Sequence, residues 1–502
     1  MPAPTGTSRR NLLLAFRSSA AGAVVTYTVN LAIVPFLLHR VGAQLYGAWA
    51  TMASILAVGA LADAGIRTEV IRRVGSAQGE GDEEGLIRSV QQGVTLLATL
   101  GAAAVVLGAL AAPAIRAFTF PGGVPGYAAS EVDLLIRATT VVLAVSLVAN
   151  GYFGVLRGVQ RADVEATGLL LSVPTGAAVT VAGVSLGWGL WALFLGNVAG
   201  LAVTVAWNRR GARRLIPGLR LRLVAITTPV AKGYLALSGL ALLSQIGDVV
   251  DTQWDKMILS RYVGSTAVTS FQIGTSLVLQ GKALALLPIA PLLVAIAELR
   301  RRDADRMEAL FSLMARAGMV LGAVVLGAVF VFAPVFVRLW LGDDASAAGA
   351  ATAARLFSVA AACNLVSAPL AFRAFGEGWH TLAAAGAAAN MVVNAILSLG
   401  LTMAIGLNGA LYGSIAGNLV GSAFFFVLMR RRMGEKWKPP PVAALAVGVA
   451  AASLAVAAGA GRIASWPSFL LAGAVYVTVV GLACARAEGL KPAELLSRGV
   501  AR

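Results

Sequence analysis

The sequence predicts an all-α integral membrane protein with about 14 transmembrane helices, for three reasons. Apolar runs of 18 or more residues recur along the 502-residue chain, and each is long enough to cross a bilayer. Charged residues make up only 13% of the chain, about half the share found in a typical soluble domain. No polar stretch exceeds about 30 residues, which is too short for a soluble domain.

Hydropathy places the predicted spans in order along the chain. They are 18–38, 45–66, 92–114, 134–156, 165–186, 189–208, 234–259, 268–297, 313–339, 353–374, 381–403, 408–430, 441–459 and 468–485. Prolines inside several spans predict kinked helices. These prolines are Pro35, Pro174, Pro288, Pro291 and Pro369.

Basic residues predict the orientation of the chain in the membrane. With the N-terminus in the cytoplasm, 30 of the 40 lysines and arginines fall in cytoplasmic segments and six fall in outside loops. Cytoplasmic loops are enriched in these residues, so we expect an even number of spans and both termini in the cytoplasm. The formal charge of +17 then indicates contact with anionic membrane lipids and argues against nucleic-acid binding.

The two halves of the chain share an internal repeat. WGLWALFLGNVAG at 188–200 and GALYGSIAGNLVG at 409–421 both carry an aromatic residue followed by G-N-x-x-G. VGAQLYGAWATMA at 41–53 and VGSTAVTSFQIGT at 263–275 both open with Val-Gly after a predicted helix. Small residues at four-residue spacing are common where membrane helices pack, so the near-constant offset of about 221 positions is the stronger signal.

A repeat of six spans gives both copies the same orientation, as in transporters built from parallel repeats. We therefore expect two pseudo-symmetric six-helix lobes around a central cavity, followed by two extra C-terminal helices. The predicted parts are an N-terminal lobe (1–208), a basic cytoplasmic linker (209–233), a C-terminal lobe (234–432), and the two extra helices with a cytoplasmic tail (433–502).

The predicted span 234–259 carries an unusual number of charged residues. In a regular α-helix, Asp248, Asp251 and Asp255 lie within about 60° of one another and share one polar face. Charge at bilayer depth is costly, so such residues face a cavity or pair with one another. The three aspartates are therefore candidates for cavity acids or for carrying a coupling proton or Na⁺.

Lys282 lies near the middle of the predicted span 268–297, and no other basic residue is so central in a span. Ammonium and guanidinium groups suit phosphate oxygens, so cations in a wet cavity could hold an anionic substrate. The candidate substrate-binding residues are Lys282, Arg137, Arg355, Gln272 and Asn30. In the alternative interpretation, Lys282 pairs with an aspartate of the preceding span and only joins two helices.

No motif for catalysis or for a cofactor is present in the sequence. The chain lacks a GxxxxGK[ST] phosphate loop and an HExxH motif. Cys363 and Cys484 lie in different apolar runs without metal-ligand spacing, which favours ordinary buried side chains. We therefore predict no enzymatic activity, no cofactor and no metal site.

Several segments resemble a known family of membrane transporters. FLLHRVGAQLYGAWATMASILAVGALADAGI (36–66) resembles its first helix pair, and NGYFGVLRGVQR (150–161) the end of its fourth helix. The segments 255–264, 287–299 and 336–344 resemble its seventh, eighth and ninth helices. On these segments, the chain resembles the polysaccharide-type, O-antigen-type flippases of lipid-linked oligosaccharides. They belong to the multidrug/oligosaccharidyl-lipid/polysaccharide exporter superfamily.

The resemblance implies two six-helix lobes around a central cationic cavity, working by alternating access. The implied activity is movement of a polyprenyl-linked saccharide from the inner to the outer leaflet of a bacterial inner membrane, for assembly of a surface polysaccharide such as lipopolysaccharide. The implied partners are that lipid-linked oligosaccharide, membrane lipids, and a polysaccharide polymerase or glycosyltransferases.

Two alternatives stay open within the same superfamily. These are a cation-coupled drug or metabolite exporter and a peptidoglycan-precursor flippase. A membrane-embedded glycosyltransferase or polymerase would need a large outside loop with catalytic residues. The longest predicted outside loop, about 115–133, has only Glu131 and Asp133 as acids, which disfavours that class.

Overall fold

The computed structural model describes residues 9–236, 249–286, 304–342, 344–434, 441–459 and 463–490. In these residues the chain is almost entirely helical, and the only β-type pairing among them is an isolated bridge between Val124 and Tyr127. The chain divides into two compact units, Met1–Gln245 and Ile246–Arg502. The predicted all-α fold class is therefore confirmed.

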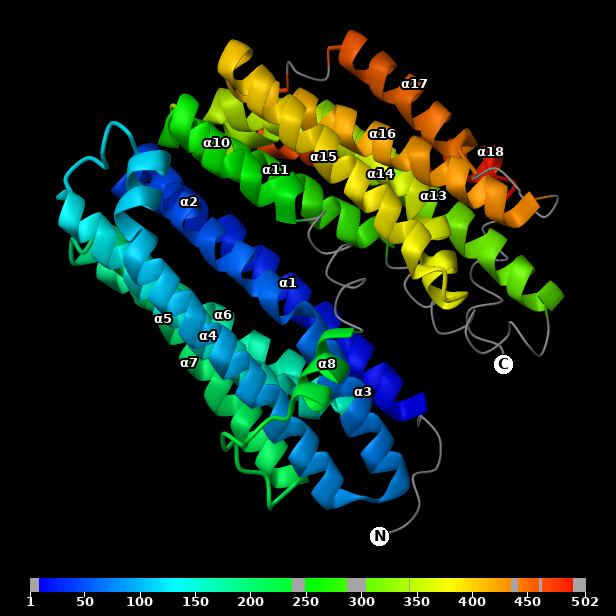
Figure 1. Cartoon of the computed structure of the whole chain (residues 1–502). Coiled ribbons are helices and arrows are strands. Elements are labelled where there is room, and N and C mark those ends of the chain that lie inside the picture. The colour runs from blue at the N-terminus through cyan, green and yellow to red at the C-terminus, as the bar shows by residue number, and fades with distance from the viewer. Residues whose placement is uncertain are drawn as a thin grey trace. The chain divides into compact units, whose positions relative to one another are not determined.

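The first unit is a bundle of long helices (Figure 1). Its elements are α1 (Arg9–Val41), α2 (Ala43–Gly59), the 3₁₀ turn η1 (Ala60–Asp63), α3 (Ala64–Glu80), α4 (Glu83–Thr119), α5 (Ala129–Gly158), α6 (Ala162–Ser185), α7 (Leu190–Leu215) and α8 (Thr228–Ala236). Helix α5 is central, since α2, α3, α4 and α7 all pack against it.

The second unit repeats this plan and adds a helical hairpin. Its elements are the π-helical turn η2 (Val250–Trp254), α10 (Asp255–Tyr262), α11 (Ser265–Leu286), α13 (Ala304–Leu341), α14 (Ala347–Gly376), α15 (His380–Ile405), α16 (Leu407–Met433), α17 (Ala443–Ala457) and α18 (Trp466–Ala487). Helix α14 is central here, with α11, α13 and α16 packed against it, while α17 and α18 pack on α13.

Several helices of the first unit have a counterpart in the second unit. Helices α4 and α13 begin 221 positions apart, and α5 and α14 begin 218 positions apart. The helix pairs also match, because α4 packs on α5 as α13 packs on α14, and α6 on α7 as α15 on α16. The internal repeat read from the sequence is thus a repeat of structure.

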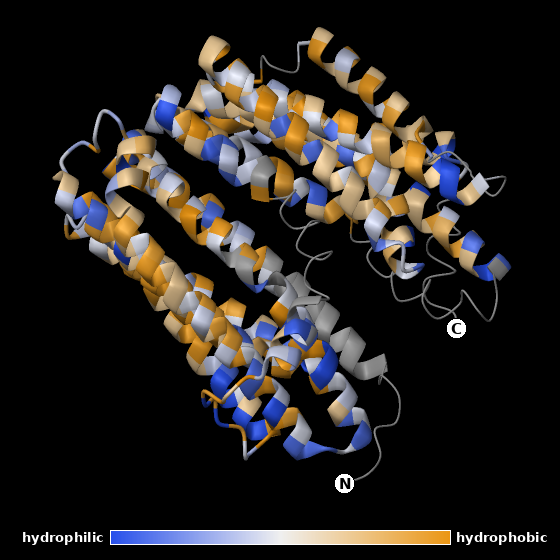
Figure 2. Ribbon diagram, in the orientation of Figure 1, coloured by the Kyte–Doolittle hydropathy of each residue, from blue (hydrophilic) through white to orange (hydrophobic). Residues whose placement is uncertain are grey.

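The helices have the length and composition of membrane spans. Among the described residues, nine helices are long and apolar enough to cross a membrane, and two shorter apolar helices lie at Val24–Arg40 and Ala443–Ala457. Each of the fourteen predicted spans contains a described helical segment. Hydrophobic residues cover the middle of the helices, and in the first unit hydrophilic residues gather at the end that carries α3 and α8 (Figure 2).

The G-N-x-x-G motifs bring the helices of two hairpins into close contact. A Cβ added to Gly196 on α7 would lie 2.7 Å from the carbonyl oxygen of Gly176 on α6. A Cβ added to Gly417 on α16 would lie 2.9 Å from the carbonyl oxygen of Asn390 on α15. Both motifs therefore serve close helix packing, as small residues do in membrane proteins.

Two of the predicted spans are not regular α-helices. The span predicted at 45–66 is interrupted by the 3₁₀ turn η1, after which α3 continues to Glu80. Asp63 at this interruption is buried, and its carboxylate accepts a hydrogen bond from the Asn150 amide on α5. This bond ties the interruption to the central helix of the unit.

The span predicted at 234–259 contains the π-helical turn η2. A π turn inserts about one extra residue per turn, so the angles of a regular α-helix do not hold across it. The single polar face expected for the three aspartates rested on those angles. The structure therefore replaces that expectation with a locally widened helix at this position.

Candidate functional site

A cavity of about 430 Å³ lies inside the second unit. Helices α11, α14 and α16 and the start of the π-helical turn form its wall. Its lining residues are Val249, Thr252, Leu279, Lys282, Ala283, Leu286, Phe357, Ala361 and Asn418. The wall is mostly apolar, with three polar side chains from three different elements.

Lys282 supplies the positive charge of this cavity. Its side chain is half-buried on α11, one turn before the last described residue of that helix. It forms no hydrogen bond or ion pair with any residue that the structure describes. A cation in such a position gains most from an anionic ligand, because the low local dielectric strengthens the attraction.

Asn418 and Thr252 are the other polar groups of the cavity. Asn418 is buried on α16, and its Nδ2 donates a 2.9 Å hydrogen bond to the carbonyl of Ser414. The Thr252 hydroxyl lies on the π turn and accepts a 3.2 Å hydrogen bond from Gln253 Nε2. Together with Lys282, they give the cavity one cation and two neutral hydrogen-bonding groups.

The candidate acids are only partly visible. Asp248 lies outside the described residues, as does the side chain of Asp251. Asp255 is fully buried at the start of α10, and its Oδ2 accepts a 2.8 Å hydrogen bond from Ser414 Oγ. Ser414 is therefore shared, since its carbonyl holds Asn418 and its hydroxyl holds Asp255.

Lys256 is a second buried lysine beside the π turn. Its Nζ donates a 2.9 Å hydrogen bond to Gln253 Oε1, and its side chain is 7% exposed. Lys256 is the second residue of α10, where its hydrogen bond braces the widened turn.

The other candidate binding residues are not among the residues that line this cavity. Gln272 is on α11, but its Nε2 donates to Ser276 Oγ at 2.9 Å, nearly three turns before Lys282. Asn30 and Arg137 belong to the first unit, where both are exposed. Of the five candidate substrate-binding residues, only Lys282 lines this cavity.

Arg355 is engaged by the backbone of a neighbouring helix. Its Nε donates a 3.0 Å hydrogen bond to the carbonyl of Phe330 on α13. Its guanidinium also lies 5.0 Å from the centroid of the Phe330 ring, in cation–π geometry.

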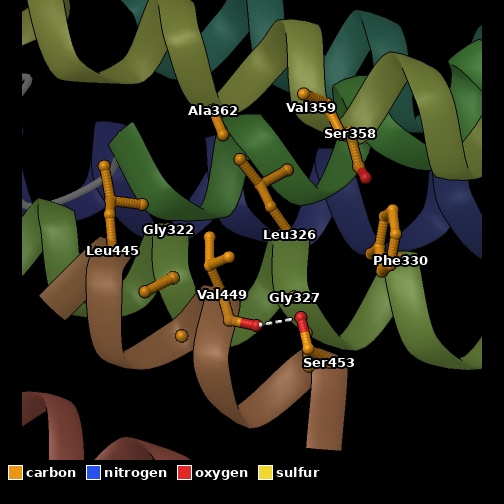
Figure 3. Close-up of a pocket in the computed structure, with 13 residues that line it drawn as sticks. Gly322, Leu326, Gly327, Phe330, Ser358, Val359, Ala362, Leu445, Val449 and Ser453 are labelled. Carbon is orange, nitrogen blue, oxygen red and sulfur yellow. Dashed lines mark hydrogen bonds between the residues drawn. The ribbon is translucent and has the colours of Figure 1, made fainter. Parts of the chain in front are cut away.

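A second, apolar pocket of about 220 Å³ lies between α13, α14 and α17 (Figure 3). Leu326, Val359, Leu445 and Val449 point into it, and Phe330 and Ser358 lie together at one end. The wall is almost free of polar groups, so this pocket suits a hydrocarbon chain.

A third cavity, of about 500 Å³, lies where α13 and α14 meet the appended hairpin. Two arginines and two glutamates line it, namely Arg316, Arg373, Glu308 and Glu488. Arg373 is buried and paired with Glu308 at 3.0 Å and with Glu377 at 3.3 Å, and Arg316 Nη1 donates a 3.4 Å hydrogen bond to the Glu488 carbonyl. Because the positive and negative charges of this lining balance, the third cavity is a weaker site for an anion than the Lys282 cavity.

Sequence reasoning missed two lining groups of the Lys282 cavity. Asn418 belongs to the G-N-x-x-G motif, which by sequence indicates helix packing. The glycines of that motif do pack on α15, but the asparagine between them faces the cavity. Phe357 lies on α14, two residues after Arg355, and nothing in the sequence singled it out.

A family model described as "Polysaccharide biosynthesis protein" matches residues 41–348 of the chain. No curated protein matches the chain in a sequence comparison.

Solved structures of several transporters share the fold. The lipid II flippase MurJ in an inward closed conformation is similar with a TM-score of 0.69 and 11% identity, over 99% of this chain and 100% of that one. An inward-facing multidrug resistance MATE family transporter of the MOP superfamily has a TM-score of 0.63 and 17% identity, over 82% of this chain and 98% of that one. A MOP superfamily transporter from Pyrococcus furiosus has a TM-score of 0.56 and 16% identity, over 85% of this chain and 96% of that one.

Proposed function

Since this chain belongs to the polysaccharide biosynthesis protein family, we propose that it is a flippase for a polyprenyl-linked saccharide. The chain is a multi-pass membrane protein with the fold of the MOP superfamily transporters. In the proposed activity, it moves the lipid-linked saccharide from the inner to the outer leaflet by alternating access. The product supplies assembly of a cell-surface polysaccharide.

The observation that carries this proposal is the charge of the Lys282 cavity. A polyprenyl-linked saccharide joins its lipid to its sugar through phosphate groups, which are anionic. Lys282 is a cation at membrane depth without a partner among the described residues, beside two neutral groups that can bind hydroxyls. Lys282 would hold the phosphate, while Asn418 and Thr252 would bind sugar hydroxyl groups.

The lipid half of such a substrate needs an apolar surface. The pocket between α13, α14 and α17 has that character, and one of its walls belongs to the appended hairpin. The match to the lipid II flippase also covers 99% of this chain, against 82% for the multidrug transporter. Both observations favour a lipid-linked substrate over a drug.

Asp255 is the described acid best placed to couple transport to an ion. It is fully buried and bonded to Ser414, which also holds the cavity residue Asn418. Binding of a proton or Na⁺ at Asp255 would change its hydrogen bond with Ser414. Because Ser414 also bonds Asn418, this change would alter the position of a residue that lines the cavity. Asp248 and Asp251 stay candidates for the same role.

The proposed setting is the inner membrane of a bacterium, with both termini in the cytoplasm. The proposed partners are membrane lipids and a polysaccharide polymerase or glycosyltransferases. The proposed transport needs no cofactor, and no residue of the chain is proposed to be catalytic.

Lys282→Ala should reduce export of the lipid-linked saccharide about tenfold or more, the usual effect of losing one charge-assisted hydrogen bond. Lys282→Arg should keep part of the activity, because it keeps the charge. The assay measures surface polysaccharide and the lipid-linked precursor left in the inner leaflet, in a strain that depends on this gene.

The matched control is Lys232→Ala, which removes an exposed lysine from α8 in the other unit. It should leave export unchanged at equal protein levels. Normal surface polysaccharide with Lys282→Ala would refute the anion-binding role. If deletion of the gene raises drug sensitivity and leaves the polysaccharide intact, the chain is a drug exporter instead.

A further inference from the structure

Helix α13 contains a proline in its apolar interior. Pro334 has no backbone N–H, so it cannot donate the helical hydrogen bond to the carbonyl four residues earlier. That carbonyl belongs to Phe330. Because no water is available in a bilayer core, a carbonyl without a donor there is costly unless a neighbouring group satisfies it.

Arg355 on the neighbouring helix α14 supplies the missing donor. Its Nε lies 3.0 Å from the Phe330 carbonyl oxygen, and its guanidinium lies over the Phe330 ring at 5.0 Å. One side chain thus contacts both the carbonyl that Pro334 leaves without its helical donor and the aromatic ring of the same residue. The next turn of α14 reinforces the arrangement, since Ser358 Oγ donates to the Arg355 carbonyl at 2.6 Å.

These contacts also define one end of the apolar pocket. Phe330 and Ser358 both line that pocket and lie together at one end of it (Figure 3). The ring of Phe330 therefore has the guanidinium as one neighbour and the pocket as another. Moving Arg355 would leave the Phe330 carbonyl without this donor and would release the ring.

The first unit offers a natural comparison. Pro113 in α4 and Pro334 in α13 are 221 positions apart, the same offset as the starts of their helices. Arg137 and Arg355 are 218 positions apart, which again matches the starts of α5 and α14. Yet Arg137 is exposed, and in the described residues no side chain donates to the carbonyl of Ala109, the equivalent of Phe330.

We propose that Arg355 is a positioning residue that replaces the N–H missing at Pro334, and so stabilises α13 at this proline and holds the Phe330 ring at the end of the apolar pocket. Its pseudo-symmetric partner Arg137 makes no equivalent contact with the residues that the structure describes. The proposal does not depend on the transported substrate.

A double-mutant cycle between Arg355 and Pro334 tests this assignment. In the wild-type background, Arg355→Ala should lower the thermal unfolding midpoint of the full chain in detergent by about 2–4 °C. In a Pro334→Ala background, the N–H at 334 can bond to Phe330, so Arg355→Ala should shift the midpoint by less than about 1 °C. Arg355→Lys keeps a cationic donor, so its unfolding midpoint should fall by less than that of Arg355→Ala.

The same cycle in the first unit is the matched control. Arg137→Ala should not couple to Pro113→Ala, because Arg137 makes no contact of this kind. Equal losses from Arg355→Ala in both backgrounds would overturn the proposal. So would loss of transport by Arg355→Ala without any change of midpoint, which would instead indicate a residue that binds substrate. Neither result depends on whether Lys282 is needed for export.

Discussion

At the scale of single residues, several buried charged side chains in the described part of this protein are held by close partners. Glu69 on α3 is nearly fully buried, and it accepts hydrogen bonds from Arg72 Nη2 at 2.6 Å and from Arg73 Nε at 2.7 Å. Arg73 also lies over the ring of Tyr234 at 4.2 Å, which fastens α8 to α3. Lys282 differs from these residues, because it lines a cavity and no described residue neutralises it.

Glu69→Gln should destabilise the protein by about 2 kcal/mol at neutral pH. Hydrogen bonds from Arg72 hold the pKa of Glu69 below its usual range, so the carboxylate contributes stability above about pH 4.3, the ordinary glutamate value. That contribution is lost as the pH falls through the lowered pKa of the folded state. Unfolding midpoints measured from pH 7 to pH 3 should therefore show the variant and the wild type converging at low pH.

Glu80→Gln is the control for this titration, because Glu80 is exposed and accepts a hydrogen bond from Ser76 Oγ. Its midpoint should follow the wild type at every pH. A Glu69→Gln deficit that stays constant down to pH 3 would show that charge is not its cause.

At the scale of elements, closely packed hairpins set the positions of the functional side chains. Helices α15 and α16 approach so closely that a Cβ on Gly417 would lie 2.5 Å from Asn390 Oδ1. This contact fixes the rotation of α16, and with it the side on which Asn418 meets the Lys282 cavity. Packing glycines and a cavity residue are thus neighbours in one motif.

Gly417→Ala should destabilise the second unit by about 1–3 kcal/mol, because the methyl group has no room against α15. Gly400→Ala on α15 should be neutral or stabilising by about 0.5–1 kcal/mol, since no atom lies within 4 Å of its added Cβ. Unfolding of both variants in detergent, followed by circular dichroism, measures the difference. Equal effects at the two glycines would contradict the packing role of the motif.

At the scale of the whole molecule, the chain is a repeated six-helix unit with a hairpin added to the second copy. The equivalent helices begin 217 to 222 positions apart, from α2 and α11 through α7 and α16. In the first unit hydrophilic residues gather at the end that carries α3 and α8 (Figure 2), as the distribution of basic residues predicts for a cytoplasmic end. The predicted orientation can be tested at exposed positions on opposite ends of this unit.

A single cysteine at Gly122 should react with a membrane-impermeant maleimide in intact cells, because the predicted topology places it outside. A cysteine at Gly79 should react only after the membrane is permeabilised. Both glycines are exposed and have open space around them, so the substitutions should not disturb the fold. The cysteines are introduced into a variant with Cys363 and Cys484 replaced by alanine. The opposite labelling pattern would show that the orientation in the membrane is the reverse of the predicted one.

Much of the fold was predictable from local composition, and the exceptions have local causes. Hydropathy located every described long helix, because a bilayer selects apolar runs of fixed length. It could not locate the 3₁₀ turn at Ala60–Asp63 or the π turn at Val250–Trp254, because hydropathy averages composition over a whole span and carries no information on the local hydrogen-bond pattern of the helix. Pro334 and Pro113 were not singled out, although the carbonyl that Pro334 leaves without its helical donor is the one that Arg355 bonds.

The candidate site was predictable only in part. Lys282 could be found because a lone cation in an apolar run is rare. Its neighbours Asn418 and Phe357 could not, since they come from helices more than 70 residues away in sequence. Which side chains meet across helices depends on helix rotation, and that rotation is set by contacts between distant segments.

The sequence by itself determined that the chain is a helical membrane protein, that its two halves repeat, and that Lys282 is an exceptional charge. These properties follow from local composition and periodicity, which a bilayer constrains strongly. Only the tertiary structure decided that Asn418 faces a cavity with Lys282, and that Arg355 is bound to the carbonyl of Phe330. The physical reason is that close packing of whole helices fixes these contacts, and no local stretch of sequence carries that information.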